Sequence, residues 1–505
     1  MSIQIQQIGI IGTGTMGAGI AQIAIQSGHD VTLFDAKAGA AEQAREKLGK
    51  TLNTLASKGK FSQEKANQDL SHLSIATELE QLKNCDLIVE AIVENLEVKQ
   101  QLMQQLESLV GTQTILASNT SSLSITAIAA GCKRPEQIVG YHFFNPVPLM
   151  KVVEVIQGFN TREDIVDALM QLSVKMGHHP VKAQDTPGFI INHAGRAFGS
   201  EAYAMLIENV ASVSELDRIY RDGIGFKMGP FELVDLTGMD VSHPVSESIY
   251  HQYYEEARYR PSVITRQRYI AKQLGRKTGK GFYDYTTGEK QGEDPAVFVE
   301  KLDQYPTVWI AADLEKDQSI LKDYLEQQGI TLETGPEPSE QALVLIASYG
   351  EDATTAALRY QINPKQVVCI DLLYGFNKHR TLMPTLITDS KHKTAAHSIF
   401  NLDGTSLSMI QESTGFVAQR VLAMIVNLGC DIAQQGVASV EDINAAVRLG
   451  LGYPYGPIEW GDKLGADKIL LILDRMSAIS RDPRYRPSAW LRRRVQLKLP
   501  LVTTV

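Results

Sequence analysis

Short apolar runs alternate with longer stretches of helical periodicity over the first part of the chain. Runs rich in Val, Ile and Leu cover residues 8–11, 31–34, 87–89, 115–117, 138–141 and 152–156. Between them, residues 17–26 and 96–109 carry apolar side chains at three- and four-residue spacing. Strands that alternate with helices indicate βαβ units. We therefore expect a Rossmann-type, doubly wound and largely parallel sheet over residues 1–184.

The pattern changes at Asp185-Thr186-Pro187-Gly188, after which no strand-like run follows over residues 189–269. Apolar side chains recur there at helical spacing. An Asp or Thr cap before Pro187, at a first-turn position, predicts that a helix starts there. Residues 185–285 are therefore expected to form a separate helical domain, which ends in a glycine-rich segment.

The helical segment recurs further along the chain. A shift of 227 residues places Gln184–Phe189 on Gln411–Phe416 without a gap. Under the same shift Gly225, Gly229, Pro230, Glu232, Asp235, Gly238 and Asp240 fall on Gly452, Gly456, Pro457, Glu459, Asp462, Gly465 and Asp467. So many matches in one frame indicate a duplicated helical domain, with the second copy at residues 411–505.

Residues 286–410, between the two copies, predict a linker and a degenerate α/β segment. Strand-like runs lie at residues 307–311, 342–347 and 367–372. We interpret the order α/β, helical, α/β, helical as duplication of a two-domain unit. The second α/β part has no GxGxxG loop, so we expect it to bind no dinucleotide. The expected fold class is α/β plus all-α.

Composition narrows the class of partner and compartment. Lys and Arg number 49 against 58 Asp and Glu, a formal net charge of -9, which argues against nucleic acid or an anionic membrane as the main partner. The four cysteines lie far apart in sequence and have no metal-ligand spacing, so we expect no metal site and a reducing cytoplasm. No run approaches the ~18 apolar residues of a membrane span.

A glycine-rich loop follows the first predicted strand and precedes a helix. In Gly12-Thr13-Gly14-Thr15-Met16-Gly17, Gly12 allows a tight turn, Gly14 lets the backbone approach a pyrophosphate, and Gly17 allows close helix–strand packing. The helix N-terminus then offers free N–H groups to that pyrophosphate. The second strand ends at Asp35, which is placed to bind the ribose hydroxyls and would repel a 2′-phosphate. The pattern predicts NAD as the cofactor; the alternative is a glycine turn without a ligand.

A histidine and a glutamate are predicted to meet across two strands. His142 lies in the run at residues 138–146, and Glu154 lies twelve residues later in the run at residues 151–156. If these strands pair as a hairpin centred on Pro148, the two side chains are cross-strand neighbours. A histidine whose other nitrogen is oriented by a carboxylate suits proton abstraction from an alcohol. The alternative is a core histidine tied to a structural glutamate.

Two further polar features follow predicted element ends. Residues 118–122, Ser-Asn-Thr-Ser-Ser, come directly after a strand, at the carboxyl edge where such sheets bind ligands. Asn192 lies in the first turns after Pro187. Taken alone, the polar stretch and Asn192 also fit a structural role as helix-cap or turn residues.

Together these motifs resemble the L-3-hydroxyacyl-CoA dehydrogenases. The resemblance rests on the glycine loop, on residues 89–95, 118–122, 142–146 and 185–192, and on residues 228–233. It implies that His142 is the general base, that Glu154 orients it, and that Ser121 and Asn192 hold the substrate oxygens. It also implies an NAD site and, less directly, coenzyme A contacts. The NAD residues so implied are Gly12, Gly14, Thr15, Met16, Gly17, Asp35, Glu94, Lys99, Ser121 and Asn145; the coenzyme A residues are Thr51 and Lys58.

The tandem layout is similar to the bacterial form that oxidises 3-hydroxyadipyl-CoA in phenylacetate breakdown. The resemblance thus implies an acyl-CoA substrate, and either a homodimer or a monomer in which the second helical copy replaces the partner. Two other functions stay open. One is a 3-hydroxybutyryl-CoA or fatty-acid β-oxidation dehydrogenase, and the other is a non-catalytic NAD-binding protein.

Overall fold

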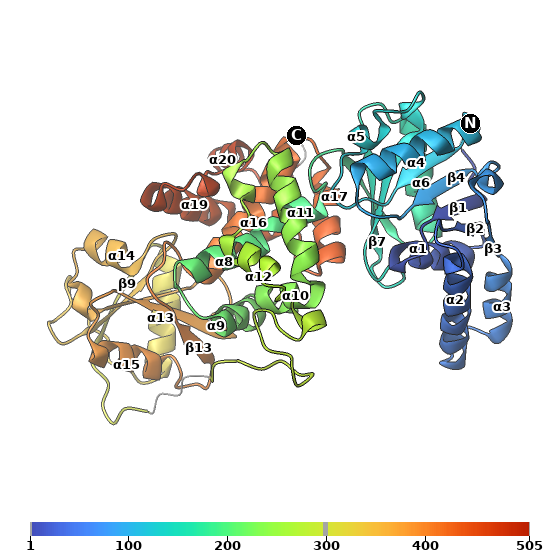
Figure 1. Cartoon of the computed structure of the whole chain (residues 1–505). Coiled ribbons are helices and arrows are strands. Elements are labelled where there is room, and N and C mark those ends of the chain that lie inside the picture. Colours follow the sequence, from blue (N-terminus) through green and yellow to red (C-terminus); the bar gives the residue numbers. More distant parts are fainter. Residues whose placement is uncertain (1–2, 296–300, 504–505) are drawn as a thin grey trace. The chain divides into compact units, whose positions relative to one another are not determined.

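The computed structural model describes residues 3–295 and 301–503, which fall into two compact units (Figure 1). Unit 1 runs to His193 and also takes in Ile432–Gly452. Unit 2 consists of Ala194–Asp431 and the chain from Tyr453 onward. The fold is an α/β sheet domain with a helical domain in two parts around a second sheet, which confirms the expected fold class.

Unit 1 is built on an eight-stranded sheet of order β3-β2-β1-β4-β5-β6-β7-β8. The strands are parallel except where β7 runs antiparallel to β6. Its strands are β1 (Gln7–Ile11), β2 (Asp30–Phe34), β3 (Leu73–Ile75), β4 (Leu87–Glu90), β5 (Ile115–Ser118), β6 (Ile138–Phe143), β7 (Val152–Gln157) and β8 (His179–Gln184). Its helices include α1 (Thr15–Gln26), α2 (Ala40–Ser57), α3 (Gln63–Ser71), α4 (Leu96–Leu109), α5 (Ile125–Ala129), α6 (Glu163–Lys175) and α7 (Ile191–Ala194).

All six strands expected in this segment are present, and β3 and β8 are additional. β3 has only three residues, too few for a periodic signal. β8 alternates buried and less buried positions and carries Pro180 and Lys182, as an edge strand does.

The helix expected to begin at Pro187 begins instead at Ile191. Residues 187–190 form a turn in which Gly188 has φ 79° and Phe189 has φ 50°, so the chain reverses before the helix can start. Asp185 caps another helix: its carboxylate accepts the N–H groups of Ile125 and Thr126 in the first turn of α5, at 3.0 and 2.7 Å.

The first helical copy continues from α7 through short helices. They are α8 (Arg196–Ile207), α9 (Val213–Arg218), a π-helical turn (Ile219–Ile224), α10 (Pro230–Thr237), α11 (Met239–Gln252) and α12 (Val263–Ile270). The second copy repeats the scheme with α16 (Val417–Gln434), α17 (Val440–Ala446), a π-helical turn (Val447–Leu451), α18 (Pro457–Leu464), α19 (Ala466–Ser480) and α20 (Ala489–Gln496).

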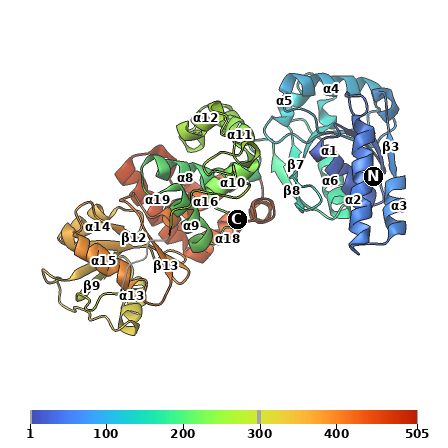
Figure 2. The same cartoon turned by 60° about the horizontal axis from the view of Figure 1, so that its bottom comes forward.

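The segment between the copies forms a five-stranded sheet of order β13-β12-β11-β10-β9. Its elements are β9 (Val308–Ala312), α13 (Glu315–Gln327), β10 (Leu343–Ala347), α14 (Ala353–Arg359), β11 (Val367–Ile370), β12 (His379–Pro384), α15 (Ser390–Ile399) and β13 (Ser406–Met409). Figure 2 shows the three helices around this sheet. The expected strands are β9, β10 and β11; β12 and β13, which hold buried His379, Arg380 and Ser408, were not expected.

The pairing of this sheet repeats that of β4 to β8. β11 is antiparallel to β12, as β6 is to β7, and the other neighbouring pairs are parallel. Even single contacts recur: Thr161 donates to the carbonyl of Ile138 at 2.5 Å, and Thr388 donates to that of Val367 at 2.6 Å. Residues 301–410 contain no counterpart of β1 to β3, and therefore none of the strand–loop–helix unit that holds the glycine loop.

In the second sheet the positions that match His142 and Glu154 are Asp371 and Thr381, joined by a bond from the Asp371 N–H to the Thr381 carbonyl at 3.1 Å. Gln419, which matches Asn192, is completely buried. Its amide accepts from the N–H of Gly350 at 2.8 Å and donates to the Ser348 carbonyl and Asp371, at 2.9 and 3.1 Å. Burial raises the pKa of Asp371 to about 6.

These contacts predict a structural role for Gln419. Gln419→Ala is expected to change kcat less than about threefold, under ~1 kcal/mol in barrier terms. It should lower the free energy of unfolding by about 1–3 kcal/mol, because buried backbone groups lose their partners. Steady-state kinetics and urea denaturation test both points. Asn192→Ala, the matched change in the first copy, should lower kcat. Loss of activity in the Gln419 variant would show that the matching site around Gln419 itself takes part in the chemistry.

The two helical copies share buried ion pairs inside unit 2. Arg420 of α16 is fully buried; its guanidinium contacts Glu201 of α8 at 3.3 Å, Glu208 at 3.1 Å and the Tyr485 hydroxyl at 2.8 Å. Arg258 of the first copy forms an ion pair with Asp431 of the second. Because buried charges are tolerated only when paired, these contacts hold the copies in one register.

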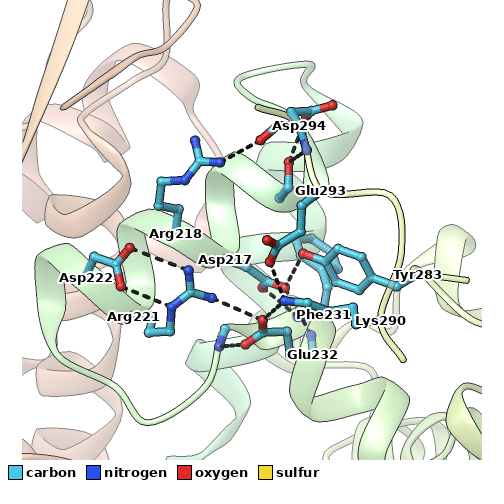
Figure 3. A network of polar contacts seen from close by, with 12 residues as sticks. Asp217, Arg218, Arg221, Asp222, Phe231, Glu232, Tyr283, Lys290, Glu293 and Asp294 are labelled. Carbon is cyan, nitrogen blue, oxygen red and sulfur yellow. Dashed lines mark hydrogen bonds and ion pairs between the residues drawn. The ribbon is translucent and has the colours of Figure 1, made fainter. Parts of the chain in front are cut away.

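A shared motif begins the matching helices α10 and α18. Pro230 and Pro457 occupy the first helical position, and Glu232 and Glu459 accept the N–H groups of Gly229 and Gly456. In the first copy, buried Asp217 accepts the N–H groups of Phe231 and Glu232 at 2.9 and 3.1 Å and the Tyr283 hydroxyl at 2.7 Å (Figure 3). Burial raises the pKa of Asp217 to about 7. The motif therefore builds the helix start.

Each helical copy packs against the sheet that precedes the other copy in the chain. The N–H of Gln184, at the end of β8, donates to the Val437 carbonyl at 2.8 Å in unit 1. Under the same shift of 227, the N–H of Gln411 donates to the Val210 carbonyl at 2.8 Å in unit 2. In unit 1, α17 of the second copy lies against β7 and β8, and in unit 2 the first π-helical turn lies against β12. Each helical copy thus completes the sheet domain of the other.

None of the helices within residues 3–295 and 301–503 is long and apolar enough to cross a membrane.

Candidate active site

The glycine loop joins β1 to α1 at the carboxyl edge of the first sheet. Gly12 has φ 89°, and a Cβ at Gly17 would lie 1.8 Å from the Gly12 carbonyl oxygen, so both positions require glycine. At Gly14 a Cβ would meet nothing within 4 Å. Gly14 and Thr15, at the N-terminus of α1, are exposed, whereas the Met16 side chain packs on the core. The loop therefore offers open backbone at the place where a pyrophosphate binds, which fits NAD.

Asp35 follows β2 directly and faces this loop. One carboxylate oxygen accepts the Thr13 N–H and hydroxyl, each at 2.8 Å, and the other accepts the Lys37 N–H at 2.9 Å. Burial alone would raise the pKa of Asp35, but the N–H donors of Thr13 and Lys37 outweigh it and lower the pKa. An ionised carboxylate beside the loop fits the two hydroxyls of an unphosphorylated ribose.

Glu94 lies between the predicted NAD and substrate residues. One of its oxygens accepts the Thr120 hydroxyl at 2.6 Å and the N–H of Ser121 at 3.0 Å. Lys99, 1% exposed, lies beneath it and bonds both oxygens of buried Glu90 at 2.9 Å and Glu94 at 3.4 Å. Burial opposes but does not offset the effect of Lys99 and these donors, which lower the pKa of Glu94. Lys99 is buried, and its contact with the partly exposed Glu94 connects it to the surface of the site.

His142 and Glu154 are direct partners across β6 and β7, as the hairpin predicts. The Nδ1 of His142 lies 2.7 Å from Oε2 of Glu154, and both side chains are buried. The other oxygen of Glu154 accepts the N–H groups of Ile190 and Ile191, each at 2.9 Å. Both oxygens of the Glu154 carboxylate are therefore held by hydrogen bonds, and the carboxylate orients the imidazole of His142.

Ser121 and Asn192 are also brought together. The side-chain amide of Asn192 on α7 donates to the Ser121 carbonyl at 3.0 Å. Hydrogen bonds and ion pairs thus connect Lys99 to Glu94, Glu94 to Ser121, and Ser121 to Asn192. Asn192 follows Ile191 directly, and Ile191 donates to Glu154, the partner of His142. The exposed Asn145 lies three residues beyond His142.

Thr51 and Lys58 are exposed on α2 and at its C-terminal end. The Thr51 hydroxyl donates to the Lys47 carbonyl within the helix, at 3.0 Å.

Four contributors were not found from sequence. The N–H groups of Ile190 and Ile191 carry no side-chain signal. Asn119, whose amide oxygen accepts the Phe143 N–H at 2.9 Å, lies inside the predicted polar stretch but was not singled out. Glu90 is also detectable in the sequence, as a charge at the end of an apolar strand.

A dinucleotide-binding sheet, an acidic residue at the end of β2 and a buried histidine–carboxylate pair define a nicotinamide-dependent dehydrogenase. Comparison with known families agrees. The model for "3-hydroxyacyl-CoA dehydrogenase, NAD binding domain" matches residues 7–186, and the model for the C-terminal domain of that enzyme matches residues 188–285 and 415–500. The chain belongs to the 3-hydroxyacyl-CoA dehydrogenase family and is an NAD-dependent oxidoreductase.

Individual relatives span the whole chain or its first half. The 3-hydroxyadipyl-CoA dehydrogenase of Escherichia coli is 38% identical over 99% of both chains. A crystal structure of 3-hydroxybutyryl-CoA dehydrogenase from E. coli K12 matches with a TM-score of 0.87 and 36% identity, covering 98% of this chain and 99% of that one. The 3-hydroxybutyryl-CoA dehydrogenase of Clostridioides difficile is 41% identical over 55% of this chain and 99% of its own.

Proposed function

We propose that the protein oxidises an L-3-hydroxyacyl-CoA with a terminal carboxylate, 3-hydroxyadipyl-CoA, to the 3-oxoacyl-CoA. The observation that carries this substrate is the full-length match to the 3-hydroxyadipyl-CoA dehydrogenase, which extends through both helical copies. A second candidate is 3-hydroxybutyryl-CoA, which the full-length structural match favours by its name.

In this reaction His142 acts as the general base. Glu154 holds Nδ1, so that nitrogen carries the proton and Nε2 accepts the proton of the substrate hydroxyl. Ser121 and Asn192 hold the substrate oxygens, and the Glu154 side chain, bonded to Nδ1, stabilises the imidazolium that forms. When bound, NAD supplies the acceptor for the hydride from the substrate carbon. A non-catalytic role is disfavoured because all four residues are present and lie in one connected arrangement.

The glycine loop and Asp35 form the NAD site in this proposal, and Glu94 lies beside them with its partner Lys99. The full set of NAD residues is Gly12, Gly14, Thr15, Met16, Gly17, Asp35, Glu94, Lys99, Ser121 and Asn145. Thr51 on α2 and Lys58 just beyond its end, both exposed, contact coenzyme A in this proposal.

Asp35→Ala is expected to raise the Kd of NAD by roughly 10–100-fold, because a charged hydrogen bond of about 1.5–3 kcal/mol to the ribose is lost. Binding of NADP, whose 2′-phosphate this carboxylate repels, should weaken far less. Calorimetric titration of both nucleotides measures the two effects. Equal losses would mean that Asp35 acts only by ordering the loop through Thr13.

The substrate is tested by kcat/KM over a series of 3-hydroxyacyl-CoAs of increasing chain length, with and without a terminal carboxylate. We expect the six-carbon dicarboxylic substrate to exceed its monocarboxylic equivalent by at least tenfold, about 1.4 kcal/mol of transition-state binding. If kcat/KM is highest for 3-hydroxybutyryl-CoA, the proposed substrate is wrong, but the proposed reaction stands. No turnover of any member would contradict the enzymatic role itself.

A further inference from the structure

The second helical copy reaches the backbone that holds Glu154. Its segment Ile432–Gly452 belongs to unit 1, where α17 packs on β7 and β8. The π-helical turn after α17 ends this segment, and Gly450 lies within it. π-Helical turns are rare and occur often at functional sites.

Gly450 lies close to two neighbours of Glu154: Val152 on the same strand and Ile191, which donates a hydrogen bond to it. A Cβ at Gly450 would lie 2.4 Å from Cδ1 of Ile191 and 3.4 Å from Cγ1 of Val152. Val152 precedes Glu154 by two residues on β7 and so lies on the same face of the sheet. Ile191 donates its N–H to Glu154 at 2.9 Å. Gly450 has no positive φ, so the reason for glycine here is space and not backbone conformation.

We propose that Gly450 is a positioning residue for catalysis: by seating Ile191, the second helical copy fixes the N–H donors that hold Glu154 and, through it, His142. This inference rests on the proposed function of the His142–Glu154 pair. It gives the second copy a task in the reaction although its own matching positions hold no catalytic pair. Gln419 and Gly450 thus differ: Gln419 fills the second copy's own inactive site, and Gly450 supports the active site of unit 1.

The chain contains a matched control. Gly223 occupies the same place in the first π-helical turn, which packs on β12 of the second sheet. A Cβ at Gly223 would lie 3.7 Å from its nearest neighbour, Cβ of His379, which is ordinary contact. The counterpart of Ile191 there is Ala418, and the strand carries Thr381 in place of Glu154.

The test compares Gly450→Ala with Gly223→Ala in the full chain. Gly450→Ala is expected to lower kcat by about fivefold, ~1 kcal/mol in barrier terms, because the new Cβ displaces the end of the Ile191 side chain and only part of that shift reaches its backbone N–H. The Kd of NAD, measured by titration, should stay unchanged, since the glycine loop and Asp35 follow β1 and β2, which β4, β5 and β6 separate from β7. Gly223→Ala should leave kcat within about twofold of the parent, under ~0.5 kcal/mol in barrier terms.

A second variant separates positioning from general damage to the fold. Ile191→Val removes Cδ1, the atom that the new Cβ would strike, so Gly450→Ala combined with Ile191→Val should recover most of the kcat lost in Gly450→Ala. Three outcomes would each overturn the proposal. They are equal kcat in the two glycine variants, a loss of NAD binding in Gly450→Ala as large as its loss of kcat, and no recovery of kcat in the double variant. The proposed function is tested separately, because an active His142→Gln enzyme would contradict the base itself, whatever Gly450 does.

Discussion

His142→Gln is expected to keep NAD binding and to lose roughly 10²–10⁴-fold in kcat, the usual contribution of general-base catalysis. Glutamine keeps a hydrogen-bonding side chain of similar reach in the buried place between β6 and Glu154, but it cannot accept the substrate proton at neutral pH. Steady-state oxidation of a 3-hydroxyacyl-CoA, followed at the NADH absorbance, measures the loss.

The control for His142→Gln is the Kd of NAD, which should match that of the parent because the loop and Asp35 are unchanged. Near-normal kcat in this variant would refute His142 as the base. A loss of NAD binding in parallel with kcat would instead mean that the substitution disturbs the whole carboxyl edge of the sheet.

Arg420→Met is expected to lower the free energy of unfolding of unit 2 by about 3 kcal/mol or more, because it leaves a buried carboxylate with one partner fewer. Glu201 is completely buried, and its remaining partners among residues 3–295 and 301–503 are Arg484, at 3.3 Å, and the Tyr485 hydroxyl. All three tryptophans, Trp309, Trp460 and Trp490, lie in unit 2, so their fluorescence during urea denaturation reports this unit.

Arg493→Met serves as the control, since Arg493 is an exposed residue of α20 and its replacement should change stability by less than about 0.5 kcal/mol. Equal unfolding midpoints for the Arg420 and Arg493 variants would contradict the role assigned to the buried ion pairs. In that case aromatic contacts between the copies, such as Phe226 against Tyr453 and Trp460, would have to hold unit 2 together.

Much of the site could be predicted because its signals are local or follow strand geometry. The glycine loop requires its residue types at fixed spacing, and His142 and Glu154 are equidistant from one turn, so antiparallel pairing brings them together. Sequence shows the charge of Lys99 but not that Glu90 and Glu94 surround it, so its place in the NAD site stays a prediction.

Other features depend on contacts that no local pattern encodes. Asp185 has the form of a cap for the helix that follows it, and only the folded chain shows that it caps α5, about 60 residues earlier. The repeat predicted a second helical copy, but the shift of 227 residues does not tell which sheet each copy packs on. That choice is made by long-range contacts such as the bond between Gln184 and Val437.

The inclusion of Ile432–Gly452 in unit 1 has a consequence for the order of events during synthesis. Domains generally fold as units, from the N-terminus, while the ribosome adds about 5–20 residues per second. Unit 1 has its whole sheet once His193 has emerged, yet it lacks the segment that covers β7 and β8 until about 240 more residues are made, on the order of 10–50 seconds later. During that interval the face of β7 and β8 that α17 covers lacks this segment, so the completed active site is a late product of translation.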